Sequence, residues 1–159
     1  MKVAIIMGSK SDYEVVSKAE TVLADFGVEY VTRVISAHRT PDIAADFAAN
    51  AEENGFEVII CAAGKAAHLA GVMAGGSALP VIGIPMKTSD MGGMDSLLST
   101  VQMPKGVPVA TVAIGGAENA ALLAVQILSV KYPELRQAFK DYKRKMAEDI
   151  MAIDAEMNK

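Results

Sequence analysis

The sequence has few of the residues that build disulfides and metal centres. Its 159 residues include one cysteine, Cys61, two histidines, His38 and His68, and no tryptophan. A single cysteine cannot form an intrachain disulfide or a multi-cysteine zinc site, and two histidines do not favour a dedicated metal cage. We therefore expect no bound metal, and we expect a reducing compartment, the cytoplasm.

An excess of positive charge is also absent. Lysine and arginine together number 15 against 19 aspartates and glutamates, so the net charge is −4. Nucleic-acid binders and basic membrane-surface proteins carry the opposite balance. The longest stretch without a charged residue, 66–86, is divided by glycines, Pro80 and Pro85, and the first apolar run, 3–7, is too short for a signal peptide. We expect neither a nucleic-acid partner nor a membrane segment.

Apolar residues make up 52% of the sequence, enough to fill the core of one domain. Short apolar runs alternate with longer amphipathic segments, which is typical of βα units on a parallel sheet. We expect strands at 2–7, 29–35, 57–62, 80–84 and 108–114, and helices up to about 26 and at 41–54, 66–77, 95–102, 117–131 and from 133 onward. The pattern predicts an α/β fold with three αβα layers, a flavodoxin-like parallel sheet of about five strands, and an extended C-terminal helix.

Two of the expected helices concern assembly. The helix at 66–77 is small and apolar on nearly every face, so we expect a second subunit to cover it. The last helix, about 133–157, carries an apolar stripe at steps of three and four residues. The stripe comprises Leu135, Phe139, Tyr142, Met146, Ile150, Ile153 and Met157. It could pack on its own domain or on a neighbouring subunit, and we expect the neighbour.

Ligands of open parallel sheets bind beyond the carboxyl ends of the strands, so the informative loops are 8–12, 36–41 and 63–68. In the first loop, Gly8, hydroxyl groups and Asp12 precede a helix, a suitable place for a phosphate or a sugar. The chain lacks the patterns GxxxxGK[ST] and GxGxxG, which excludes P-loop hydrolysis and Rossmann dinucleotide binding. Alternatively, Ser11 and Glu14 form a capping box and the loop is only structural.

The second loop contains His38 and Arg39 directly before a helix start, with Thr40 as the N-cap and Pro41 as the first helical residue. An exposed histidine can act as a general acid or base, and the planar arginine fork can pair with phosphate. The alternative is a merely solvated histidine.

For His68 the structural interpretation is the stronger one. In the first turn of an apolar helix, its ring could donate to a backbone carbonyl. We expect Cys61 to be a small core residue rather than a nucleophile. The glycine-containing segment 86–94 is a candidate lid, or a plain surface loop.

Segments along nearly the whole chain match the signature of one enzyme family. They are MGSKSD at 7–12, SAHRTP at 36–41, AAHL at 66–69 and DSLLSTVQMP at 95–104. In sequence and order they resemble 5-(carboxyamino)imidazole ribonucleotide mutases, and the last segment resembles the bacterial branch rather than the animal-type carboxylases. Lys65, where glycine is usual, and Ala70, where proline is common, depart from the family pattern. Lys65 could contact a phosphate or point outward.

The resemblance implies an isomerase of purine biosynthesis. It would move a carboxylate from the exocyclic nitrogen of the ribonucleotide to ring carbon 4, without metal or organic cofactor. His38 matches the family's catalytic histidine, and Ser9, Asp12 and Arg39 match substrate-binding residues, with Arg39 toward the phosphate and Asp12 toward the ribose. The segments lining the same pocket contain Ser11, Ser36, Gly64, Ala66 and His68. The resemblance also implies a homo-octamer that exchanges the C-terminal helix.

Two competing functions stay open at this point. A direct carboxylase would share the fold but use aminoimidazole ribonucleotide and carbon dioxide. A non-catalytic, receiver-like module would share only the fold. A receiver requires an acidic residue where the third strand ends, and Cys61-Ala62-Ala63 offers none.

Overall fold

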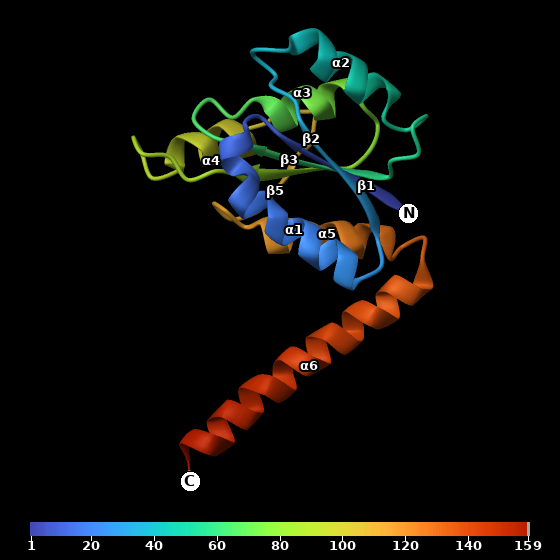
Figure 1. Cartoon of the computed structure of the whole chain (residues 1–159), viewed down its shortest axis with the longest axis vertical. Coiled ribbons are helices and arrows are strands. Elements are labelled where there is room, and N and C mark those ends of the chain that lie inside the picture. Colours follow the sequence, from blue (N-terminus) through green and yellow to red (C-terminus); the bar gives the residue numbers. More distant parts are fainter. Residues whose placement is uncertain (159) are drawn as a thin grey trace.

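The computed structural model describes residues 1–158, which are built around a five-stranded parallel sheet in the order β2-β1-β3-β4-β5 (Figure 1). The strands are β1 (Lys2–Met7), β2 (Glu29–Val34), β3 (Val58–Ala63), β4 (Val81–Pro85) and β5 (Ala110–Thr111). The helices are the short 3-10 helix η1 (Lys10–Asp12), α1 (Tyr13–Asp25), α2 (Pro41–Asn50), α3 (Leu69–Gly76), α4 (Met94–Val101), α5 (Ala117–Leu128) and α6 (Pro133–Met157). The predicted α/β class and strand order are confirmed.

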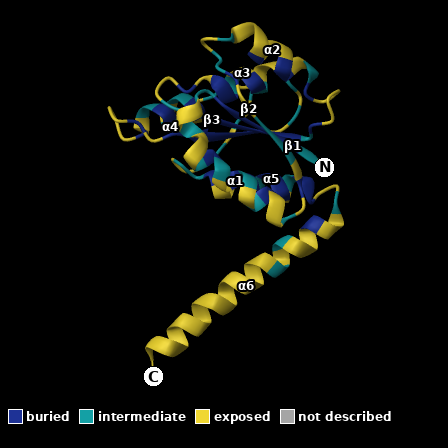
Figure 2. Cartoon of the chain, viewed as in Figure 1, coloured by how far each residue is buried: buried dark blue, intermediate teal, exposed yellow. Residues whose placement is uncertain are grey.

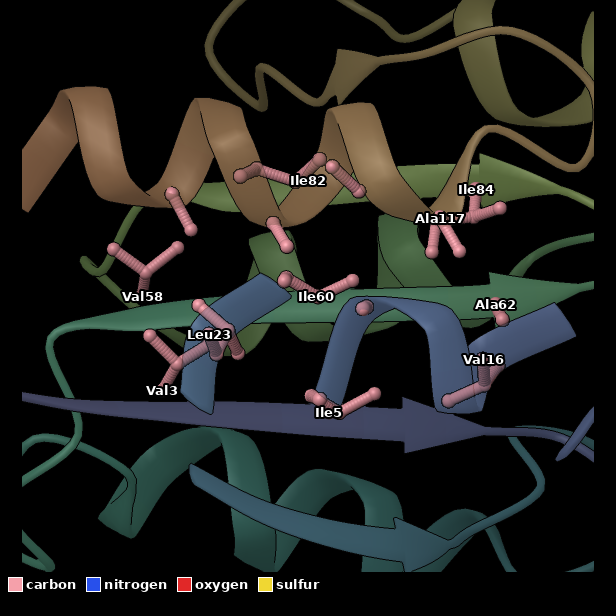
Figure 3. Packing of buried hydrophobic residues seen from close by; sticks show 14 of the residues in the cluster. Val3, Ile5, Val16, Leu23, Val58, Ile60, Ala62, Ile82, Ile84 and Ala117 are labelled. Atoms are coloured by element: carbon pink, nitrogen blue, oxygen red, sulfur yellow. The ribbon is translucent and has the colours of Figure 1, made fainter. Parts of the chain in front are cut away.

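Alternation along the strands divides the core between the two faces of the sheet. In β1, Val3 and Ile5 lie in one buried cluster, with α1 and α5, while Ala4 and Ile6 lie in the other, with α2 and α3. Figure 3 shows the first of these clusters, in which Ile5 lies among residues of neighbouring strands and of the covering helices. Each isoleucine buried in this way stabilises the fold by about 1.5–3 kcal/mol.

Some predicted boundaries are wrong. The third predicted helix begins at Leu69, because residues 65–68 turn and the His68 N–H donates to the Ala66 carbonyl. The fifth strand shrinks to two residues at the edge of the sheet. The α3 helix is not buried all round within one chain, since Val72 is 38% exposed. Its cover by a second subunit stays a prediction.

The last helix does not fold back along its own domain (Figures 1 and 2). Its first turns are anchored by the buried Leu135 and by Phe139 and Tyr142, whose rings contact Phe26. Beyond these, α6 extends away from the sheet and leaves the apolar stripe exposed, with Ile150 67% exposed. Only the first part of the stripe thus packs on its own domain, and cover of the rest by a neighbouring subunit stays a prediction. Within residues 1–158, no helix combines the length and apolar character needed to cross a bilayer.

Candidate functional site

A cleft of about 510 Å³ lies at the carboxyl ends of β1, β2, β3 and β4. This volume is in the range of small-molecule sites. Every site residue predicted from the sequence lines it: Ser9, Ser11, Asp12, Ser36, His38, Arg39, Gly64, Ala66 and His68. The loops after the first three strands therefore converge, as the strand order requires. The roles of the individual residues stay predictions.

The first loop presents hydroxyl groups and a carboxylate to the cleft. Ser9 caps η1, its Oγ accepting the Ser11 N–H at 3.3 Å. The Ser11 hydroxyl lies 2.9 Å from Ser9 Oγ and 3.3 Å from Asp12 Oδ1. Desolvation raises the pKa of Asp12, and the hydrogen bond from Ser11 opposes that rise. The predicted capping box is absent, because Asp12 occupies the N-cap of α1 and makes no side-chain cap bond.

The second loop holds Arg39 in a fixed position. The Thr40 hydroxyl accepts the Ser36 N–H at 3.0 Å and donates to the Ser36 carbonyl at 2.9 Å, which closes the loop before Pro41. Arg39 donates from Nε to Ser36 Oγ at 3.2 Å and from Nη2 to the Gly8 carbonyl at 2.5 Å. The guanidinium thus bridges the loops after β1 and β2, and its remaining donors are available to an anion.

The two histidines are hydrogen-bonded to each other. Nε2 of His38 lies 2.9 Å from Nδ1 of His68, and their rings meet edge to face at a centroid separation of 4.9 Å. Such a bond needs a proton on one nitrogen and a lone pair on the other, so the pair can relay a proton. His68 lies at the N-cap of α3, and its ring contacts His38 rather than the backbone carbonyl that the structural interpretation expects. Its role stays a prediction.

The fourth loop, between β4 and α4, also lines the cleft, through Met86, Lys87, Thr88 and Ser89. The prediction of a candidate lid anticipated this segment, but the predicted site residues did not include it. The sequence signal that could have identified this segment is its position directly after β4, a strand of the same parallel sheet that carries the other loops of the cleft.

The Lys65 side chain is 72% exposed, which agrees with the outward alternative, and a phosphate contact stays a prediction. Lys65 Nζ lies 2.7 Å from Asp90 Oδ2.

The remaining chemically interesting groups do not form a second centre. Cys61 is fully buried on β3, and desolvation raises the pKa of its thiol far above the ordinary value, which suits a core residue. Among residues 1–158, no three side chains of histidine, cysteine, aspartate or glutamate gather as a metal site would require. The groups that the cleft itself presents are imidazoles, hydroxyls, cations and one carboxylate.

Comparisons with known proteins show the family and the fold of the chain. The family model described as AIR carboxylase matches residues 2–149. The N5-carboxyaminoimidazole ribonucleotide mutase of Saccharolobus solfataricus is 54% identical over 155 residues, covering 98% of both chains. The mutase of Mycobacterium tuberculosis is 49% identical over 158 residues, covering 99% of this chain and 91% of the relative. The crystal structure of Treponema denticola PurE matches with a TM-score of 0.88 at 30% identity and covers 99% of both chains.

Proposed function

We propose that the chain, which belongs to the AIR carboxylase family, is an N5-carboxyaminoimidazole ribonucleotide mutase. Relatives along nearly the whole chain carry that name, which favours the mutase over the direct carboxylase. The observation that carries the proposal is the convergence of the histidine pair and the fixed Arg39 in one cleft. The proposed reaction is an isomerisation within de novo purine biosynthesis.

The substrate would span the cleft from Arg39 to His38. A ribonucleotide carries a phosphate, for which the guanidinium has unused donors, and ribose hydroxyls, for which the Asp12 carboxylate and Ser9 hydroxyl are suitable partners. Ser11 and Ser36 brace these groups through the bonds described above. This arrangement leaves the imidazole ring of the substrate beside the histidine pair.

In the proposed chemistry His38 gives up one proton and takes up another. In the first step the bond between the exocyclic nitrogen and the carboxylate breaks, carbon dioxide is released, and His38 donates a proton to that nitrogen. Ring carbon 4 then attacks the carbon dioxide, and His38 takes the proton that carbon 4 loses. The carboxylate thus moves from the nitrogen to carbon 4, the nitrogen gains one proton, carbon 4 loses one, and His38 returns to its starting protonation state, so the steps balance without an added cofactor. His68, bonded to His38, would orient its ring.

Carbon dioxide must stay beside the ring between the two steps. The small side chains of Ala37, Ala63 and Ala66 line the cleft and leave room for it, and Gly64 lies between two of them. A dry, confined space also weakens the solvation that stabilises a carboxylate in water.

Substrate preference tests the proposal. Equal amounts of the protein receive either N5-carboxyaminoimidazole ribonucleotide or aminoimidazole ribonucleotide with bicarbonate, and the 4-carboxy product is followed by absorbance. The mutase predicts fast conversion of the first substrate alone. Conversion of only the second would identify a carboxylase, and no conversion of either would favour a binding module.

We also propose a homo-octamer, as the family resemblance implies, and the exposed stripe of α6 supports the packing of this helix on a neighbouring subunit. The helix has 25 residues and so extends about 37 Å, and most of its stripe has no cover within the chain. Ile150→Glu places a charge in the stripe, whereas Glu148→Gln changes the other side of the helix. Light scattering of the full chain should show a smaller assembly for Ile150→Glu only. An unchanged octamer in Ile150→Glu would contradict the exchanged helix.

Residues 1–158 with their α6 helix would then form one mutase domain. The unpaired, buried Cys61 supports a reducing compartment, the cytoplasm, as the place where this domain works.

A further inference from the structure

One ion pair connects two loops of the cleft that are far apart in the sequence. Lys65 follows β3 and lines the cleft, and its Nζ lies 2.7 Å from Oδ2 of Asp90 in the segment between β4 and α4. Lys87, Thr88 and Ser89, directly before Asp90, form one wall of the same cleft. The ion pair therefore joins this wall to the loop that carries Ala66 and leads to His68.

The base and the tip of the β4–α4 segment are held in different ways. At the base, Thr88 donates to Asp95 at 2.7 Å and accepts the Gly93 N–H at 3.1 Å, and both Thr88 and Gly93 are buried. The tip around Asp90 is exposed, and Met91 is 60% exposed. The base is thus fixed by the fold, whereas the ion pair ties the tip to the opposite loop.

The backbone of Lys65 adds a second observation. Its φ is +56°, and it is the sole non-glycine residue with a positive φ among residues 1–158. A side chain at this conformation costs free energy that glycine would avoid, so Lys65 occupies a strained position in the loop. The charge and hydrogen bond of Lys65 also lower the pKa of Asp90, as expected for a formed pair.

We propose that Lys65 is a positioning residue, whose ion pair with Asp90 holds the tip of the β4–α4 segment against the β3–α3 loop and so shapes the cleft wall at Lys87–Ser89. The kinetic consequence rests on the proposed function, while the link between the loops does not. Both partners are exposed, so the pair is weak and sensitive to salt. It acts as a latch that a modest perturbation can open.

Limited trypsin digestion of the full chain tests the link without any assay of activity. Lys65→Met and Asp90→Ala each remove one charge, and mass spectrometry follows cleavage after Lys87. We expect about threefold faster cleavage in both variants at low salt, and a smaller difference from the wild type at high salt. The control Lys18→Met, on the exposed side of α1, should match the wild type. Unchanged cleavage after Lys87 in both variants would overturn the latch.

Steady-state kinetics test whether the latch positions the substrate. Lys65→Met and Asp90→Ala should raise KM about threefold with little change in kcat, and the exchange Lys65→Glu with Asp90→Lys should restore KM. A higher KM in Lys65→Met but not in Asp90→Ala would overturn the proposal in favour of direct contact between Lys65 and the substrate. If cleavage is faster but KM is unchanged, the ion pair affects only the structure of the loops, and the proposed positioning role is also overturned. An inactive wild type would refute the proposed function and leave the digestion result standing.

Discussion

Replacing Arg39 by alanine should weaken substrate binding more than it slows the chemical step. The guanidinium already donates to the Gly8 carbonyl at 2.5 Å and to Ser36 Oγ at 3.2 Å, which fixes its plane across the cleft. Three of its five N–H donors remain for a phosphate. Hydrogen bonds to charged groups contribute about 1.5–3 kcal/mol, so losing this contact should cost about 2–3 kcal/mol of binding. This corresponds to a rise of about 30- to 150-fold in Kd.

The assay measures KM and kcat together with the Kd of a bound product by calorimetry. Arg39→Ala should raise KM and Kd by similar factors, while kcat falls only a few fold because His38 is intact. Arg39→Lys keeps the charge but loses the planar fork, so its KM and Kd should lie between those of the wild type and those of Arg39→Ala. Arg33→Ala is the matched control, since Arg33 lies over the Phe47 ring, away from the cleft. Unchanged KM and Kd in Arg39→Ala would refute the phosphate role.

Further predictions concern catalysis, packing and pH. His38→Asn should leave the melting temperature unchanged, because the side chain is exposed. It should lower turnover at least about 100-fold, because an amide cannot give and take the proton. Retained turnover would remove His38 from the mechanism. Gly83→Ala places a Cβ 2.4 Å from Cγ2 of Thr100, so urea unfolding should show a loss of about 1–3 kcal/mol, and full stability would contradict this packing. Burial alone would raise the pKa of Glu57, but hydrogen bonds such as that from Tyr132 lower it on balance. The stability that Glu57 contributes is therefore present above its ordinary pKa of 4.5 and is lost as the pH falls through the folded value. Glu57→Gln should be less stable than the wild type at pH 7 and equal to it near pH 2. A difference in unfolding free energy that stays constant with pH would refute this.

The centre of the sheet could be predicted because β1, β3 and β4 are buried on both faces and read as short apolar runs. Residues 2–7 were predicted as a strand with the bounds that β1 has. Residues 108–114 have the same apolar character, yet only Ala110 and Thr111 pair as β5, at the edge of the sheet beside β4. The sequence pattern indicates that a strand exists, but it does not show how many of its residues pair with a neighbouring strand.

The convergence of the loops followed from strand order, but the contacts between their side chains did not. The apolar pattern after the glycine-containing turn predicts a helix from residue 66, with His68 in its first turn. The chain instead takes a left-handed conformation at Lys65 and starts the helix at Leu69, which leaves the His68 ring free to meet His38. Such pairings depend on loop conformations set by tertiary contacts, and no local propensity encodes them.

The Lys65–Asp90 pair illustrates the same limit. Both residues lie in loops, separated by an entire βα unit, and neither motif nor spacing relates them. The conformation of each loop has to be known before the two charges can be placed 2.7 Å apart.

The fate of the transferred carboxylate tests the central claim most directly. The protein receives N5-carboxyaminoimidazole ribonucleotide labelled with ¹³C in the carboxylate, in buffer containing unlabelled bicarbonate, and mass spectrometry reads the 4-carboxy product. If carbon dioxide is held in the cleft between the two steps, the product retains the label. Product that carries the unlabelled carbon of the bulk bicarbonate would show that carbon dioxide leaves before the new bond forms, which contradicts an intramolecular transfer.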